Sequence, residues 1–337
     1  MTPMADHADS STRRALVTGA TGYIGSRLVP RLLEEGWTVR VLTRDRKKVA
    51  ERRWVDEVEI VEGDATTKLT LAEALADVDV AYYLLHSMDG KPGFAERDRD
   101  MARIFGVAAF EADVGRIVYL SGLHPEGRLS DHLASRVEVG DLLMASGVPT
   151  AVLQAAVILG SGSASFEMLR HLTHRLPVMV APKWLNNRIQ PIAVRDVLYY
   201  LVAAAELPPE VNRTFDIGGP DVLTYREMIQ RYARVTDHGS RAIFTVPVLT
   251  PWLASHWVGL VTPVPSGIAK PLVGSLIHEV VCRENDLDGM VGAPDGGAMG
   301  FDDAVLASMD PEHGPRPEPG TVDPARITSA DPKWAGD

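Results

Sequence analysis

Three glycines spaced three residues apart could hold a phosphate group. They follow a short apolar run and open a stretch with helical periodicity. In such a turn the first glycine allows a tight bend, the second lets the backbone approach a pyrophosphate, and the third lets helix and strand pack closely. The free N–H groups of the first helical turn would face the anion, although an ordinary strand–helix turn is the alternative. The residues expected to bind a dinucleotide here are Thr18, Gly19, Thr21, Gly22, Tyr23, Ile24 and Gly25.

The elements that must position this turn alternate between apolar strands and amphipathic helices. Strands are predicted at 15–17, 38–42, 58–61, 78–85, 116–120 and 150–159, with helices at 24–33, 95–112 and 131–145. Such alternation favours parallel pairing with right-handed crossovers. The fold class predicted is therefore α/β, a Rossmann-type doubly wound parallel sheet with a smaller C-terminal substrate subdomain.

The chain divides into four segments by composition and periodicity. Residues 1–12 read as a disordered leader, 13–160 as the dinucleotide-binding Rossmann domain, and 161–309 as a substrate-binding apolar subdomain interleaved with it. In this third segment, helices are expected at 165–175, 194–206 and 225–235, and a strand at 214–217. Residues 310–337 read as a loose, acidic tail rich in Pro and Gly.

The amino-acid composition excludes several classes of protein. The 337 residues carry 34 Lys and Arg against 45 Asp and Glu, a formal net charge of −11, and 45% are hydrophobic. This apolar share is typical of a globular chain, and the acidity argues against nucleic-acid binding. A single cysteine, Cys282, excludes a disulfide scaffold and indicates a reducing, cytoplasmic compartment. We expect neither a secretory signal nor a spanning helix.

Several further motifs resemble one superfamily. Gly63-Asp64 follows the third strand, residues 192–197 read IAVRDV, 215–219 read FDIGG, and 82–88 read YYLLHSM. Together with the glycine spacing, they resemble short-chain dehydrogenase/reductases of the extended and atypical groups. The narrower resemblance is to the NAD(P)H-binding, NmrA-like branch that includes complex I 39-kDa-type subunits. It implies that Asp64, with Ala65 beside it, contacts the adenine.

The end of the second strand bears on the choice between NADP(H) and NAD(H). NAD-preferring enzymes place an acid there to bond the ribose hydroxyls. Here that position is Thr43, followed by Arg44. A hydroxyl beside a guanidinium would hold a 2′-phosphate through charge-assisted hydrogen bonds. The sequence predicts NADP(H), with NAD(H) left open because Asp45 could serve the ribose.

The resemblance implies a catalytic Tyr and a Lys four residues later, but this sequence differs. Those places are held by His132 and Arg136. A histidine can act as a general acid or base near neutral pH, and an arginine can bond ribose hydroxyls but cannot relay a proton. Ser121 is the hydroxyl nearest the family's serine, whose place by count is Gly122. A surface histidine with a solvated arginine is the competing interpretation.

Other polar residues could contact cofactor or substrate. His86 and Ser87 follow the fourth strand, at the edge where doubly wound sheets bind ligands. His171 and His174 share a helix face, but no third ligand accompanies them, so no metal is expected. The segment 243–277 could cap an apolar pocket, pack as an irregular core, or touch a membrane surface through Trp252 and Trp257.

Two functions follow from these residues. The first is an NADP(H)-dependent oxidoreductase acting on a carbonyl, hydroxyl or quinone compound, its partner being a small-molecule substrate. The second is a non-catalytic NADP(H)-binding redox sensor or assembly protein, which the altered Tyr and Lys positions favour. The substrate and the oligomeric state stay open.

Overall fold

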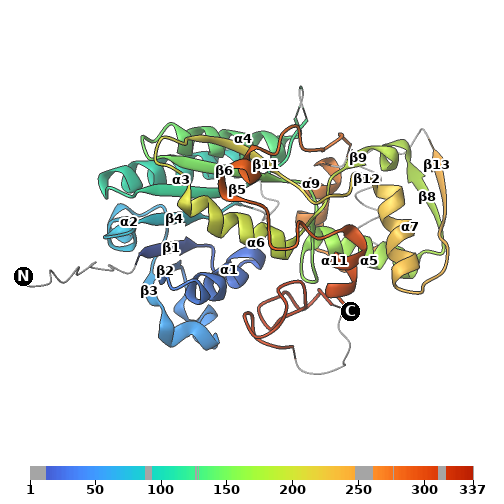
Figure 1. Ribbon diagram of the computed structural model, residues 1–337, viewed down its shortest axis with the longest axis horizontal. Helices are drawn as coiled ribbons and strands as arrows, with labels where there is room; N and C mark the ends of the chain where they lie inside the picture. The colour runs from blue at the N-terminus through green and yellow to red at the C-terminus, as the bar shows by residue number, and fades with distance from the viewer. Residues whose placement is uncertain are drawn as a thin grey trace, which may run out of the picture.

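The computed structural model describes residues 13–87, 93–125, 127, 129–246, 261–275, 277–309 and 316–336. A seven-stranded sheet forms its centre, in the order β11-β6-β5-β4-β1-β2-β3 (Figure 1). Every neighbouring pair in that sheet is parallel. This confirms the predicted Rossmann-type fold. The strands are β1 (Arg14–Thr18), β2 (Thr38–Thr43), β3 (Glu59–Glu62), β4 (Val80–Tyr83), β5 (Arg116–Gly122), β6 (Thr150–Ala155) and β11 (Arg213–Ile217).

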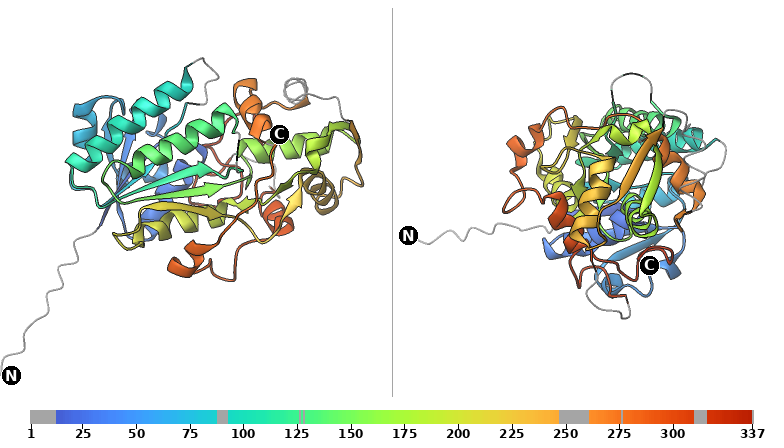
Figure 2. Two further views of the ribbon diagram at one scale, coloured as in Figure 1. Left: turned by 90° about the horizontal axis from the view of Figure 1, so that it is seen from above. Right: turned by 90° about the vertical axis from the view of Figure 1, so that its right-hand side faces the viewer.

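Helices cover both faces of this sheet (Figure 2). One apolar cluster joins the sheet to α1 (Tyr23–Glu34) and α6 (Val194–Ala203). A second joins the other face to α2 (Lys68–Leu75), α3 (Phe94–Glu111) and α4 (Asp131–Met144). Successive strand residues enter opposite clusters, as the period of a strand requires, so the strands read as continuous apolar runs.

The later part of the chain builds a second region from short elements. These are β7 (Ile158–Leu159), α5 (Ala164–Arg175), β8 (Val178–Pro182), β9 (Arg188–Ile189), β10 (Ile192–Ala193), β12 (Leu223–Thr224), α7 (Tyr225–Val235), β13 (Ala242–Val246), α9 (Ser266–Ser275), α10 (Asp286–Val291) and α11 (Phe301–Ala307). They form three two-stranded sheets, β10-β7, β12-β9 and β13-β8. Short 3₁₀ turns are η1 (Arg46–Lys48), η2 (Arg53–Glu57), η3 (Lys183–Asn186) and η4 (Ala204–Glu206).

Two predictions about the chain path were wrong. The sixth strand was expected over 150–159, but β6 ends at Ala155 and β7 pairs with β10 outside the main sheet. The tail was expected to be loose, but residues 316–336 are packed against the body. Asp331 forms a buried ion pair with Arg27 of α1, their closest atoms 2.7 Å apart. Apolar anchors of this segment, including Ile327 and Ala335, are also buried.

Some expectations lie outside the described residues. They are the leader at 1–12 and the two tryptophans of the apolar segment, Trp252 and Trp257. Within the described ranges, no helix has the length and apolar character needed to cross a membrane.

Candidate active site

The glycine turn between β1 and α1 has the geometry that its spacing predicts. Gly19 has a φ of +69°, and a Cβ there would lie 2.7 Å from the carbonyl oxygen of Leu84. A Cβ on Gly25 would lie 2.3 Å from the Gly19 oxygen, so only glycine fits where α1 crosses the turn. Gly22 caps α1, and its N–H donates to the Gly19 oxygen at 2.9 Å. The chain therefore reaches the start of α1 with no side chain in the way.

The start of α1 can hold an anion. The first N–H groups of a helix have no partner within the helix, and they carry partial positive charge. The first turn of α1 contains no acidic residue that would occupy them. Gly22 and Thr21 are exposed at this point. The residues present therefore fit a pyrophosphate.

Thr18 supports the turn from below. Its hydroxyl donates to the Tyr82 oxygen at 2.9 Å and accepts the Leu84 N–H at 3.0 Å. The side chain is fully buried, so it holds β1 against β4. Thr18 thus positions the turn. Because its hydroxyl is buried and already bonded to β4, this geometry disfavours a direct contact between the hydroxyl and a dinucleotide.

The order of the strands sets out the rest of the predicted dinucleotide site. Thr43 ends β2 and Arg44 follows it, Asp64 and Ala65 follow β3, and His86 follows β4 on the other side of β1. Parallel strands end at the same edge of a sheet, so these residues border the glycine turn on both sides. An extended dinucleotide would run along this edge.

Arg44 is a cation directly after β2. It is exposed, and its side chain makes no hydrogen bond or ion pair within the described residues. Thr43 is buried, and its hydroxyl donates to the Asp45 oxygen at 3.1 Å. The Asp45 carboxylate accepts the Lys47 N–H and caps η1. Asp45 is therefore engaged locally, whereas the Arg44 guanidinium is available to a ligand.

Asp64 is held in a local turn at the β3 end. Its carboxylate accepts the N–H and the hydroxyl of Thr66 at 2.8 and 2.7 Å. These bonds, and to a lesser degree the nearby Arg44, hold the pKa of Asp64 below its usual range. Ala65 beside it is buried. A fixed carboxylate at this edge fits the adenine contact that the resemblance implies.

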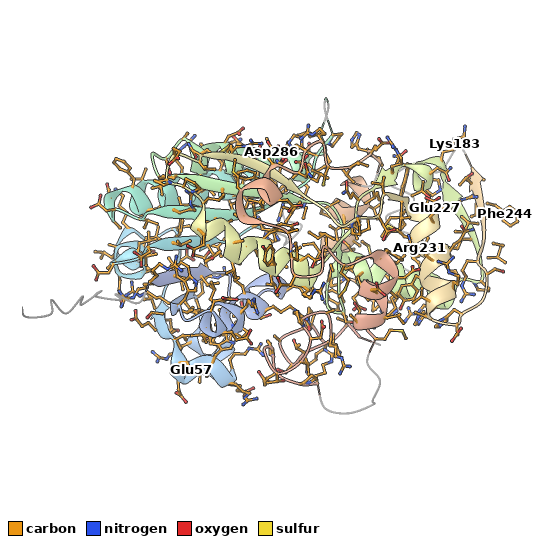
Figure 3. The ribbon with its side chains drawn as sticks, in the orientation of Figure 1. Glu57, Lys183, Glu227, Arg231, Phe244 and Asp286 are labelled. Carbon is orange, nitrogen blue, oxygen red and sulfur yellow. The ribbon has the colours of Figure 1, made fainter. Side chains whose placement is uncertain are left out.

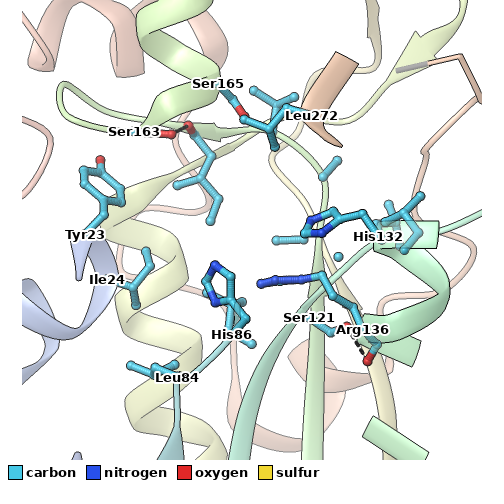
Figure 4. A pocket seen from close by; sticks show the side chains of 18 of the residues that line it. Tyr23, Ile24, Leu84, His86, Ser121, His132, Arg136, Ser163, Ser165 and Leu272 are labelled. Atoms are coloured by element: carbon cyan, nitrogen blue, oxygen red, sulfur yellow. Dashed lines mark hydrogen bonds between the residues drawn. The ribbon is translucent and has the colours of Figure 1, made fainter. Parts of the chain in front are cut away.

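A cavity of about 270 Å³ opens beside the glycine turn. Gly19, Gly22 and Gly25 form one wall, and the opposite wall comes from α4, α5 and α9. The lining is mostly apolar, and Figure 4 shows the polar side chains that converge on it. The apolar lining residues are Ile24, Leu84, Leu120, Leu123, Leu133, Val157, Ile158, Met168, Leu272 and Val280.

His86, His132 and Arg136 come together in this cavity (Figure 4). His132 and Arg136 lie one turn apart on α4, and His86 reaches in from the end of β4. The Arg136 guanidinium makes no hydrogen bond or ion pair within the described part of the chain. The structure therefore brings together three residues predicted from separate motifs, around a cation that has no carboxylate partner within the described residues.

Both histidines are held neutral at this site. Burial, and then the nearby Arg136 charge, lower the pKa of His132 to about 4. The pKa of His86 lies well below its ordinary value, through burial first and then the charges of Arg136 and His132. The His86 ring lines the cavity and the residue keeps exposed surface. At neutral pH both rings are therefore uncharged.

Ser121 lines the cavity but its hydroxyl is already engaged. It donates to the backbone oxygen of Arg136 at 3.4 Å, as does the hydroxyl of Tyr119. Ser121 therefore ties β5 to α4. Ser87 does not line the cavity; its N–H donates to the buried carboxylate of Asp98 at 2.8 Å, which fixes the start of the loop after β4.

The sequence did not identify Ser165, Arg27 or Asp331. Ser165 lines the far wall of the cavity beside Ser163, and the hydroxyl of Tyr23, a residue that the glycine turn predicted, is buried without a hydrogen-bond partner within the described residues. The Arg27 guanidinium lies 4.1 Å from the centre of the Tyr23 ring and pairs with Asp331. An isolated serine or a tail aspartate carries no spacing signal, so these contacts arise only from the tertiary fold.

Comparison with known families supports this geometry. Residues 11–246 match the model of the NmrA-like family, which is more than half of the chain. The chain belongs to the NmrA-like family. The earlier resemblance to that branch is confirmed, including by a likeness to the mitochondrial NADH-ubiquinone oxidoreductase 40 kDa subunit of Neurospora crassa. That likeness is 23% identity over 227 residues, covering 65% of this chain and 59% of the subunit.

Two further similarities bear on the site of this NmrA-like protein. A ceramide reductase of Caulobacter vibrioides is 30% identical over 195 residues, which cover 57% of this chain. The match spans only 61% of that reductase's own length. Among solved structures, a Citrobacter triphenylmethane reductase complexed with NADP(H) superposes with a TM-score of 0.66 at 17% identity. It covers 88% of this chain and all of the other, and at that identity it shows the shared fold.

Proposed function

We propose that the protein is an NADP(H)-dependent oxidoreductase that acts on a lipophilic carbonyl, hydroxyl or quinone substrate. The observation that carries this proposal is the Arg136 guanidinium, facing two neutral histidines in an apolar cavity beside the glycine turn. Such a cavity combines a binding place for an apolar body with hydrogen-bond donors for one oxygen atom. The family and the reductases it resembles support the same reaction class.

The cofactor would lie along the carboxyl edge of the sheet. The amides of Gly22 and of the first turn of α1 would hold its pyrophosphate, and the Asp64 turn would lie beside its adenine. Arg44 would bind the 2′-phosphate through charge-assisted hydrogen bonds, which supports NADP(H) over NAD(H). When bound, the reduced cofactor supplies a hydride to the substrate carbon.

Arg136 would stabilise the oxygen that becomes negative when the hydride arrives. A guanidinium offers five N–H donors, enough to bond ribose hydroxyls, as the resemblance implies, and also the substrate oxygen. The guanidinium stabilises a nearby negative oxygen most strongly where water is excluded, and the apolar lining of the cavity favours that exclusion. Arg136 itself keeps its proton throughout, because a guanidinium is not deprotonated in proteins.

His132 would supply or accept the proton. In the oxidising direction, the neutral imidazole takes the proton of the substrate hydroxyl. In the reducing direction, the neutral imidazole first takes up a proton from solvent, which the forming oxyanion favours by raising the pKa of His132; the imidazolium then gives that proton to the oxygen and returns to the neutral form. His86 faces the same space and is the second candidate for this transfer.

The experiment follows NADPH absorbance while long-chain aldehydes, ketones and quinones are supplied. His132→Phe should lower turnover by about 10²- to 10⁴-fold with cofactor affinity nearly unchanged. Arg136→Met should lower turnover by about 10²- to 10³-fold if it holds the substrate oxygen. A loss confined to cofactor affinity would instead assign it to the ribose. Arg103→Met, an exposed arginine on α3, is the matched control.

A second function rests on one specific departure from the family pattern. The Tyr and Lys of related enzymes are His132 and Arg136 here, and Ser121 donates to a backbone oxygen. A redox sensor or assembly protein would bind NADP(H) without consuming it, and its partner would distinguish the oxidised from the reduced form. Recovery of different partners by the two loaded forms would support it. Identical recovery, with NADPH consumption by the parent protein, would exclude it.

A further inference from the structure

The small sheet of β8 and β13 has an unusual outer face. Its strands are in register, with Ala242 opposite Val178 and Phe244 opposite Val180. The residues between them, Met179 and Ile243, point inward and are buried. The outward side chains are all apolar: Val178, Val180 and Phe244 are 58%, 54% and 61% exposed. Exposed apolar side chains that gather on one face mark a surface that is covered in use.

The charge around this face differs from that of the whole protein. The chain has a net charge of −11, yet residues 168–195 and 238–278 contain no Asp or Glu. The same two segments form β8 and β13 and hold seven Lys and Arg residues. Three of the seven form ion pairs with acids just outside these segments: Arg170 with Glu167, Arg188 with Glu279 and Arg195 with Asp196. An apolar face inside an acid-free, basic stretch of an acidic protein favours a surface that is itself anionic.

Three of these bases flank the two strands directly. Arg175 precedes β8, Lys183 follows it, and Arg241 precedes β13. None of the three forms an ion pair with a carboxylate within the described residues. Arg175 and Arg241 donate to backbone oxygens only, and Lys183 is exposed at the tip of the molecule near Phe244 (Figure 3). Their charges are therefore available to a partner.

The position of this face connects it with the cavity. It lies at the end of the molecule opposite β1, β2 and β3 (Figures 1 and 3). α5, which leads into β8, carries Met168, and α9 carries Leu272; both residues line the cavity and pack in one cluster. A partner at the β8–β13 face would therefore lie beyond the apolar wall of the site.

We propose that the β8–β13 face docks on a lipid bilayer that contains anionic headgroups. Val178, Val180 and Phe244 would enter the interface, and Arg175, Lys183 and Arg241 would lie at the headgroups. A bilayer fits better than a protein because the apolar set is small and bases lie in the chain next to both strands. This inference stands independently of the reaction proposed above.

Flotation of the full chain with vesicles tests it. We expect binding to vesicles of phosphatidylcholine with about a third phosphatidylglycerol, weaker binding to phosphatidylcholine alone, and loss at high salt. Phe244→Ser should weaken binding about tenfold or more, and Lys183→Gln about fivefold. The matched controls are Phe110→Ser and Lys68→Gln on the nucleotide side, where Phe110 is 58% exposed; both should bind like the parent. Unchanged NADPH affinity and unchanged circular dichroism would show that each variant is folded.

Three results would overturn the proposal. One is no flotation with either vesicle type. Another is equal loss in the Phe244 and Phe110 variants, which would mean unspecific adsorption. The third is self-association that Phe244→Ser abolishes while vesicles are ignored, which would assign this face to a second copy of the chain.

Discussion

The glycine turn and the wall facing it across the cavity are built by different means. The turn uses backbone: Gly19, Gly22 and Gly25 leave room for a ligand, and the N–H groups of α1 face it. The facing wall uses side chains from α4, α5 and α9, brought together by the tertiary fold. A backbone site depends on local spacing, so few substitutions are tolerated there, whereas a side-chain site can change its chemistry residue by residue. His132 and Arg136, which the sequence resemblance places where related enzymes carry Tyr and Lys, lie on the second side.

The sharpest test of the backbone side is Gly22→Val. A branched side chain there would block the approach of a pyrophosphate, so binding of both NADPH and NADH should be abolished. The fold should survive, because a Cβ at Gly22 meets only the Gly19 oxygen at 3.2 Å. Titration calorimetry measures the binding, and circular dichroism measures the fold. Unchanged affinity would mean that the turn has a structural role only.

Gly25→Val is the matched contrast. Its Cβ would lie 2.3 Å from the Gly19 oxygen and 2.8 Å from the Cα of Ala20, both backbone atoms. We expect this variant to lose stability as well as binding. The Gly22 variant would then report on contact with the ligand, and the Gly25 variant on the packing of α1 against the turn.

The segment 316–336 is tied to α1 by the buried ion pair between Asp331 and Arg27, and Asp331→Ala tests that ion pair. The variant leaves the Arg27 guanidinium buried without a counter-charge, which should cost about 3–5 kcal/mol of unfolding free energy. Arg27 also donates to backbone oxygens of Ser161, Pro324 and Arg326, so the loss would reach α1 and the loop after β7 together. Urea unfolding measures it. Asp303→Ala, an exposed acid on α11, should stay within about 0.5 kcal/mol of the parent.

Much of the nucleotide side could be predicted from the sequence because its signals are local. Apolar runs gave every strand of the main sheet to within a few residues, and α7 lies over the predicted 225–235, where Thr224 and Glu227 form a capping box. Short elements such as β9 and β12 were missed, since two residues carry no period. α2 was missed as well, because its exposed Leu69 obscures its apolar face.

The chemistry of the cavity could be predicted only in part. Family-like spacing pointed to His132 and Arg136, and strand order brought His86 beside them. Their protonation could not be predicted, because the ordinary pKa of histidine, near 6.5, ignores burial and the Arg136 charge. The packed tail was also unpredictable: its composition is that of a loop, and it is held by partners far away in the sequence, such as Arg27, Arg52 and Glu167.

Arg44→Ala tests the cofactor preference at the far end of the same edge. Removing the guanidinium should weaken NADPH binding by roughly 1.5–3 kcal/mol and change NADH binding little, since only NADPH carries the 2′-phosphate. Calorimetric titration with both cofactors measures it. Arg46→Ala, an exposed arginine two residues later, is the matched control. Equal losses for NADPH and NADH would contradict the role given to Arg44.

The pH dependence of the unfolding free energy gives the smallest expected effect, and it tests only the cavity wall that side chains build. The folded-state pKa of His132 is about 4, below the ordinary 6.5, so between these values the unfolded chain binds more protons than the folded one. Stability from this group is therefore fully present above pH 6.5 and is lost as the pH falls toward 4. His132→Gln should reduce that loss of unfolding free energy by about 1–2 kcal/mol, less than the full pKa shift would give, because solvent in the cavity screens part of it.

His174→Gln on α5 is the control variant. Burial and the neighbouring His238 also lower the pKa of His174 to about 4, but this residue lies away from the cavity. Saturating NADPH should alter the profile of the parent and of the His174 variant, and leave the His132 variant less affected. If NADPH changes all three profiles equally, His132 does not face the bound cofactor, and the proton must come from His86 or from water.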